Sequence, residues 1–327
     1  MIRESGNLEL WKSMKDQISR IKIDPAAFLL DHPSNILTLG SCFSDSIGNR
    51  LKRLKFAVSS NPFGTLFNPI SIARNVRDAI NLSHSEEHLV FHDGLWKSLD
   101  LHSDFCHPSK EKLLLQLQRT QEDLIDRLKT VQVVFITLGS AVVFRYTKSG
   151  EIIANNHKLP SKEFQQELLG IEEIQHALTS LFEKLRGINS KIHIVLSLSP
   201  VRHLAKGAIL NQRSKARLLE GIHSVLGDRI HYFPAYELIL DELRDYRYYK
   251  DDLVHPSDQA VDSVWDGLMD YCFSSTSKEL IFEIEQVLKM QEHRTQHPKA
   301  PSSIQFQEVR QQKIEGLIQR FPHLNFD

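Results

Sequence analysis

Apolar positions along the chain alternate between short continuous runs and helical spacings. The continuous runs, rich in β-branched and aliphatic residues, predict buried strands at 36–39, 131–137, 191–198 and 229–233. Between them, apolar residues recur every three or four positions, which predicts amphipathic helices at 45–54, 71–82, 110–130, 172–185, 211–225 and 258–272. Repeated alternation of strand and helix is typical of a parallel sheet with helices on both faces.

Two segments interrupt this alternation with hairpin patterns. Asp93 and Gly94 lie between short apolar runs within 88–101, and Gly150 lies between two further runs within 141–155. Such turns between apolar runs predict antiparallel hairpins. We expect both hairpins at the edge of the parallel sheet.

The end of the chain contains helical patterns without strands. Helices are expected over 277–294 and from about 304 to 320, separated by a proline-containing break at Pro298. We therefore expect a main domain over residues 1–275 and a C-terminal helical appendage over residues 276–327. The appendage packs either on the domain or on a second subunit.

The composition is that of a globular protein of enzyme size. Of the 327 residues, 41% are hydrophobic and 25% are charged, and 40 Lys+Arg against 41 Asp+Glu give a net charge of −1. A protein so close to neutral lacks the basic footprint of a nucleic-acid or acidic-membrane binder. No apolar run approaches the roughly 20 residues that span a bilayer.

Targeting and cysteine patterns point to the cytoplasm. Residues 1–20 carry charges and no apolar core stretch, so we expect no secretory signal. The 3 cysteines are widely spaced and odd in number, which argues against a disulfide framework and a cysteine-based zinc finger. We expect a cytoplasmic protein.

The first predicted strand ends in a glycine–serine turn. Gly40 and Ser41 lie between this strand and the helix at 45–54. Ligands of open parallel sheets bind at the carboxyl ends of the strands, and a helix N-terminus favours a developing negative charge. Ser41 is therefore either a nucleophile or only a helix cap. Cys42 is either a reactive thiol or a packing residue, and we favour packing because free cysteines are commonly buried.

A second polar segment precedes the helix at 258–272. Pro256 marks a loop before this helix, which places His255 on the loop. Asp252, three residues earlier, is close enough to orient the imidazole. A serine nucleophile needs a base, and the base needs an orienting carboxylate. Ser41, His255 and Asp252 together predict a catalytic triad, against the alternative of a capping aspartate and a surface histidine.

Several segments resemble a known family. Residues 39–44 read Leu-Gly-Ser-Cys-Phe-Ser, which resembles the name-giving motif of the GSCFA-domain family, within the wider SGNH/GDSL-like hydrolase group. Over roughly residues 33–275, further segments resemble family segments in family order, at 61–69, 137–140, 154–160, 199–203, 211–217, 232–237, 241–247 and 252–257. The resemblance implies a flavodoxin-like α/β/α sandwich with a mostly parallel sheet, and hydrolysis of ester bonds, often of O-acyl groups on carbohydrates.

Carried over to this chain, the resemblance also implies roles for single residues. Ser41 would be the nucleophile, His255 the base and Asp252 its orienter. The oxyanion hole would use the Ser41 amide and Gly64. The wider group adds an asparagine after the third strand, but Ala141 stands about where it would be, and losing one donor costs roughly 10²–10³ in turnover. The candidates to replace this donor are Ser140, Asn155 and Asn156.

Further polar residues are candidates for substrate binding. They are His102, His157, Arg202, His203, Arg213 and Lys215. Cations near the start of the helix at 211–225 oppose its dipole, so they face either an anionic substrate or a structural network with nearby acids. Those acids are Asp241, Glu242 and Asp245. The histidines at 92–107 match no standard zinc spacing, so we expect no metal.

These patterns together predict a serine esterase. It would hydrolyse an O-acyl ester through an acyl-serine intermediate, without a cofactor or a metal. The expected substrate is a small-molecule or carbohydrate ester, such as an acylated carbohydrate or an anionic metabolite. Two alternatives stay open: an acyltransferase that uses the same acyl-serine, and a non-catalytic binding module that retains the fold. A second copy of the chain, bound through the C-terminal helices, is the expected protein partner.

Overall fold

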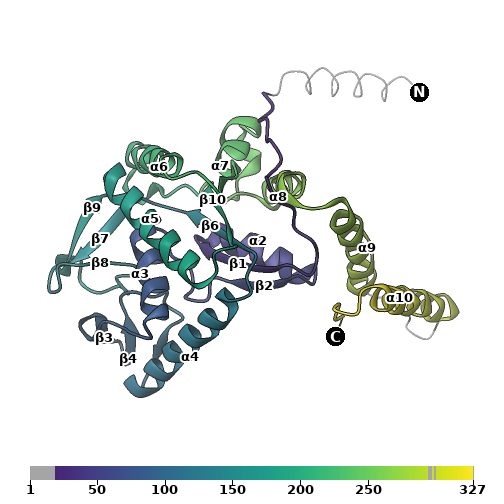
Figure 1. Ribbon diagram of the computed structural model, residues 1–327, viewed down its shortest axis with the longest axis horizontal. Coiled ribbons are helices and arrows are strands. Elements are labelled where there is room, and N and C mark those ends of the chain that lie inside the picture. The colour runs from purple at the N-terminus through teal and green to yellow at the C-terminus, as the bar shows by residue number, and fades with distance from the viewer. Residues whose placement is uncertain (1–18, 294–296, 298–299, 327) are drawn as a thin grey trace.

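The computed structural model describes residues 19–293, 297 and 300–326 (Figure 1). The prediction of no secretory signal concerns residues 1–20, and most of these lie outside the described residues. The same is true of Pro298, at the predicted break between the last two helices.

Within the described residues, five parallel strands form the central sheet. They are β1 (Asn35–Gly40), β2 (Ala57–Ser60), β6 (Val133–Leu138), β10 (His193–Leu198) and β11 (Ile230–Tyr232). Their order across the sheet is β11-β10-β6-β1-β2, and each neighbouring pair is parallel. Counted along the sequence, this is the flavodoxin-like order 2-1-3-4-5. The predicted fold class is confirmed.

Helices cover both faces of this sheet, because side chains of a strand alternate in direction. In β1, Leu37 and Leu39 belong to one hydrophobic core, whereas Ile36 belongs to a second core on the opposite face. The first core is covered by α3 (Pro69–Ile80), α4 (Lys110–Leu128), α5 (Ile171–Ile188) and α6 (Ala208–His223). The second is covered by α2 (Cys42–Arg53) and α8 (Asp258–Cys272), as Figure 1 shows. The result is an α/β/α sandwich.

Two small antiparallel sheets lie outside the central one. The first contains β3 (Leu89–His92), β4 (Leu95–Ser98) and β5 (Cys106–His107), and the second contains β7 (Val142–Tyr146), β8 (Ile152–Ile153) and β9 (Phe164–Leu168). Asp93 and Gly94 join β3 to β4 with φ of 53° and 72°, as a two-residue hairpin turn with two positive φ angles requires. Both predicted hairpins are confirmed, but their strands pair with each other and not with the central sheet.

The last two helices are α9 (Ser275–Glu292) and α10 (Pro301–Arg320). Ile281 and Ile284 of α9 are buried in the same core as α2 and α8, and Ile314 and Leu317 of α10 belong to that core as well. In Figure 1 the two helices extend from the body next to α8. The domain boundary after residue 275 stays a prediction.

None of the helices in the described part of the chain has both the length and the apolar composition that crossing a membrane demands.

Candidate active site

The junction of β1 and α2 is tightly built around Ser41. Gly40 has a φ of +127°, and a Cβ at this position would lie 2.1 Å from the carbonyl oxygen of Thr137. Ser41 is fully buried, and its amide donates to the same Thr137 oxygen at 3.0 Å. Its hydroxyl oxygen accepts a hydrogen bond from the amide of Phe43 at 3.3 Å. The Ser41 side chain therefore caps α2.

Asp252 and His255 form a hydrogen-bonded pair on the loop before α8. Oδ2 of Asp252 lies 2.7 Å from Nδ1 of His255, and Oδ1 accepts from the amides of Val254 and His255 at 2.8 and 2.9 Å. These bonds, led by the His255 amide, lower the pKa of Asp252 to about 2. Because an ionised carboxylate can only accept, Nδ1 carries the proton, and Nε2 is left as a proton acceptor.

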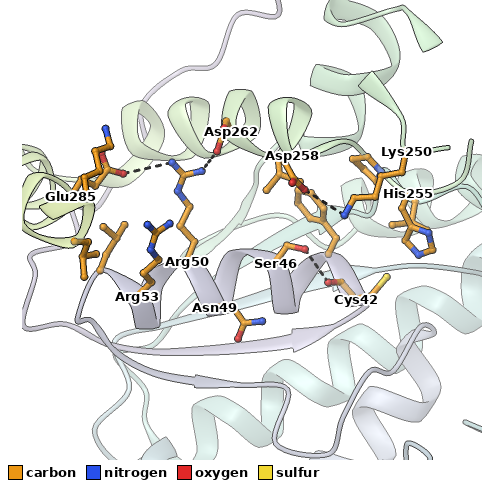
Figure 2. Close-up of a pocket in the computed structure, with 17 residues that line it drawn as sticks. Cys42, Ser46, Asn49, Arg50, Arg53, Lys250, His255, Asp258, Asp262 and Glu285 are labelled. Atoms are coloured by element: carbon orange, nitrogen blue, oxygen red, sulfur yellow. Dashed lines mark hydrogen bonds and ion pairs between the residues drawn. The ribbon is translucent and has the colours of Figure 1, made fainter. Parts of the chain in front are cut away.

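A cavity of about 700 Å³ lies beside this pair. Figure 2 shows Cys42 and His255 at one end of it, with the Cys42 sulfur on the side of His255, and Arg50 and Glu285 at the other end. The walls come from three helices and the His255 loop. Other polar lining residues are Ser46, Asn49 and Arg53 from α2, Asp258 and Asp262 from α8, and Lys289 from α9.

The charges on these walls are largely paired. Arg50 forms ion pairs with Asp262 and, at 3.7 Å, with Glu285. Lys250 lies 3.4 Å from Asp258. The cavity therefore presents cations and carboxylates side by side, which suits a polar substrate better than an apolar one.

The predicted oxyanion residues Gly64, Ser140 and Asn155 each form hydrogen bonds within their own turns. The Gly64 amide donates to Asn61 O at 2.7 Å. Ser140 Oγ accepts from the Val142 amide at 2.9 Å, and Asn155 Oδ1 accepts from the His157 amide at 2.9 Å. Neither Ser140 nor Asn155 is among the residues that line the cavity. The structure thus places Gly64, Ser140 and Asn155 in turns and loops that do not line the cavity.

None of the six predicted substrate-binding residues lines the cavity; the first four are His102, His157, Arg202 and Arg213. Nδ1 of His102 lies 3.2 Å from the carboxylate of Asp104. His157 is buried, with Nε2 2.7 Å from the carbonyl oxygen of Ser98. Arg202 and Arg213, the other two, do not line the cavity either, and Arg213 is exposed.

Lys215 is buried at the carboxyl ends of two central strands. Its Nζ donates to Gly139 O at 2.8 Å and to Ser199 O at 2.6 Å. Burial lowers the pKa of Lys215 to about 7. The Lys215 amino group therefore ties the ends of β6 and β10 together, and its hydrogen bonds go to backbone carbonyls and not to the acids Asp241, Glu242 and Asp245, which were one of the two alternatives.

His203 lies next to this lysine. Its backbone amide donates to Asn211 Oδ1 at 2.9 Å, and its ring packs edge-on against Phe67. Burial lowers the pKa of His203 to about 4, so the ring is neutral at pH 7. Nε2 is buried without a hydrogen-bond partner among the described residues. His203 and Lys215 are therefore internal residues at the carboxyl ends of the central strands.

Cys42 is the site residue that the sequence patterns did not favour. It is the first residue of α2 and half-buried, so that it packs against the second core and also lines the cavity. The sequence feature that could have indicated Cys42 is its position at the start of a helix that follows a strand. Among the described residues, no three His, Cys, Asp or Glu side chains converge as ligands of a metal ion.

Residues 35–267 match the GSCFA family. No curated protein is similar enough in sequence to count as a relative. Among solved structures, a carbohydrate esterase of family 3 from Talaromyces cellulolyticus shares 10% identity and a TM-score of 0.36, over 77% of this chain and 99% of that chain. A serine-to-alanine mutant of an acetyl esterase with an acetate ion shares 11% identity and a TM-score of 0.35, over 78% of this chain and 99% of that chain.

Proposed function

The chain belongs to the GSCFA family, and from this premise we propose that it hydrolyses acyl esters in the cavity beside α2. One observation carries the proposal. His255, hydrogen-bonded to Asp252, lines this cavity together with Cys42, the first residue of the helix that follows the first strand of the sheet. A base with its orienting carboxylate, placed beside a helix N-terminus, is the arrangement that acyl transfer requires.

In the proposed reaction, His255 moves the proton. Nε2 accepts the proton of a nucleophile as that nucleophile attacks the ester carbonyl, and it returns the proton to the leaving alcohol. Asp252 keeps the proton on Nδ1 and stabilises the imidazolium that forms. The N-terminus of α2 favours the negative charge that develops on the carbonyl oxygen. The predicted nucleophile, Ser41, stands at the start of this helix and stays a prediction.

The substrate we propose is a polar ester, such as an acylated carbohydrate or an anionic metabolite. Both signs of charge line the cavity, so that its carboxylates can accept hydrogen bonds from hydroxyl groups and its cations can donate to them. Arg53 lies at the end of the cavity away from His255, where it is paired with Glu292, and Lys289 also lines the cavity and can bind an anionic group.

A panel of acyl esters tests the proposal. We expect the full chain to release acid and alcohol from short-chain p-nitrophenyl esters and from at least one acetylated sugar. His255→Ala removes the base, and we expect the rate to fall by roughly 10²–10⁴. The matched control is His84→Ala, since His84 is also paired with a carboxylate, Glu86, but lies outside the cavity. Equal rates in both variants would contradict the proposal.

A further inference from the structure

Two neighbouring residues at the start of α2 carry groups that can attack an ester, and they face different surroundings. The Ser41 side chain is fully buried, and its oxygen accepts a hydrogen bond from the Phe43 amide. The Cys42 side chain is half-buried and lines the cavity together with His255. A substrate in this cavity therefore meets the thiol of Cys42 and not the hydroxyl of Ser41.

The backbone also distinguishes the two residues. The Ser41 amide donates to Thr137 O at 3.0 Å. Cys42 is the first residue of α2, and its amide is one of the four that a helix N-terminus leaves without a partner in the helix. The backbone amide of the nucleophilic residue is a common oxyanion donor. If the thiol of Cys42 attacks, the amide of Cys42 can therefore donate to the oxyanion.

From these positions, and resting on the proposed function, we infer that the thiol of Cys42 is the nucleophile and that the intermediate is a thioester on Cys42. The base is His255, oriented by Asp252. Ser41 is then a structural residue that fixes the start of α2. The chain is in this respect a cysteine-dependent esterase.

The chemical steps balance with water as the co-reactant. Sγ of Cys42 forms a bond to the carbonyl carbon while its proton passes to Nε2 of His255. The bond between this carbon and the alkyl oxygen then breaks, and the imidazolium protonates the departing alcohol. Water next attacks the thioester and gives a proton to His255. The carbon–sulfur bond breaks, the proton returns to the sulfur, and the acid leaves.

The surroundings of the thiol explain why it needs a base. Burial, and after it the nearby Asp45 carboxylate, raise the pKa of Cys42, whereas Lys215 acts in the opposite direction. The thiol is therefore protonated at neutral pH. Proton removal by His255 during the attack, as in a serine enzyme, suits such a thiol better than a permanent thiolate.

The test is to acetylate the full chain with p-nitrophenyl acetate, quench it in acid and locate the acetyl group by mass spectrometry. We expect the acetyl group on Cys42, at up to one per chain, and in Ser41→Ala it stays on Cys42. In Cys42→Ala the burst of p-nitrophenol is lost. In His255→Ala we expect acetylation of Cys42 to slow by about 10²-fold. Cys106, which is also half-buried, is the internal reference, and Cys106→Ala keeps the burst.

These results test the assignment of Cys42 as the nucleophile separately from the proposed hydrolase activity. Acetylation of Ser41, an unchanged burst in Cys42→Ala, or acetylation of Cys42 that is no faster than that of Cys106 would overturn the assignment. Circular dichroism of Cys42→Ala and of Cys42→Ser shows that a lost burst does not come from misfolding. If Cys42 is acetylated with the help of His255 but no ester of the panel is turned over, the nucleophile is supported and the hydrolase proposal fails.

Discussion

At the scale of single residues, a buried carboxylate joins α3 to the first small sheet. Asp100 lies 2.7 Å from Nδ1 of His88 and accepts from Arg74 at 2.8 Å. Burial alone would raise the pKa of Asp100, but His88 and Arg74 outweigh it, so that the pKa lies below its ordinary 3.8. The stabilisation is therefore complete above that value and is lost as the pH falls through the lower pKa of the folded state.

We predict that Asp100→Asn lowers the free energy of unfolding by about 3 kcal/mol, because it leaves the buried Arg74 without its nearest charge partner. Urea unfolding measures the change. Asp126→Asn is the control, since Asp126 pairs with Lys129 on the exposed surface of α4 and should change the value by less than about 1 kcal/mol. Similar decreases in the free energy of unfolding of both variants would show that the burial of Asp100 does not strengthen its contribution to stability.

A second prediction concerns the orienting carboxylate. Its hydrogen bonds lower the pKa of Asp252 from the ordinary 3.8 to about 2, so the carboxylate is ionised at neutral pH and its bonds are lost as the pH falls through about 2. NMR of the labelled carboxyl carbon should follow this titration. In His255→Ala the midpoint should rise only part of the way to 3.8, because the backbone amides at 254 and 255 still donate. A full return to 3.8 would mean that the imidazole alone holds the charge.

The residue scale is also where the sequence was least informative. The pairing of Asp252 with His255 followed from a spacing of three on one loop, which is a local property. Whether Ser41 or Cys42 faces the cavity depends on which of them caps α2, and both residues suit a helix start. The partners of Lys215 are backbone carbonyls, and backbone groups carry no signature in a sequence.

At the scale of elements, most helices were predictable because each has one buried face, and the inner strands because both of their faces are buried. The helix at 258–272 was predicted with the bounds that the structure has. The strand β2 was missed because it has four residues, lies at the edge of the sheet and has no buried position. Residues 57–60 form a strand because they pair with β1, and the local sequence contains no pattern that predicts this pairing.

The close contact between the end of β1 and β6 allows a prediction at this scale. Gly40→Ala would place a Cβ 2.1 Å from Thr137 O at a φ of +127°, so we expect a loss of about 2–3 kcal/mol in unfolding free energy. Gly187, near the end of α5, is the matched control. A Cβ there meets nothing within 4 Å, so Gly187→Ala should stabilise the chain by roughly 0.5–1 kcal/mol. A stable Gly40→Ala would mean that the strand ends can move apart.

At the scale of the whole molecule, α9 belongs to the second core. Arg50 and Arg53 of α2 form ion pairs with Glu285 and Glu292 of α9, and Ile284 is fully buried. Helix α9 therefore contributes a wall of the cavity, through Glu285, Leu288 and Lys289. Self-association through the exposed sides of α9 and α10 stays a proposal, which light scattering of the full chain would test.

We predict that Ile284→Ala lowers the free energy of unfolding of the whole chain by about 3 kcal/mol, because it opens a hole in that core. The control is Phe282→Ala, since Phe282 is 62% exposed on the same helix and should cost less than about 0.5 kcal/mol. Denaturant unfolding, followed by tryptophan fluorescence, measures both. If Ile284→Ala leaves the main transition unchanged, α9 unfolds separately from the sheet.

The parts of the cavity lie near opposite ends of the polypeptide: Cys42 follows the first strand, whereas His255 and Glu285 come late. During synthesis, the ribosome therefore adds Cys42 long before it adds His255. At about 5–20 residues per second, the delay is on the order of ten seconds or more. On the proposed chemistry, a half-made chain holds a thiol that nothing can activate. On this chemistry, Cys42 gains its base only once the segment that carries His255 has been made.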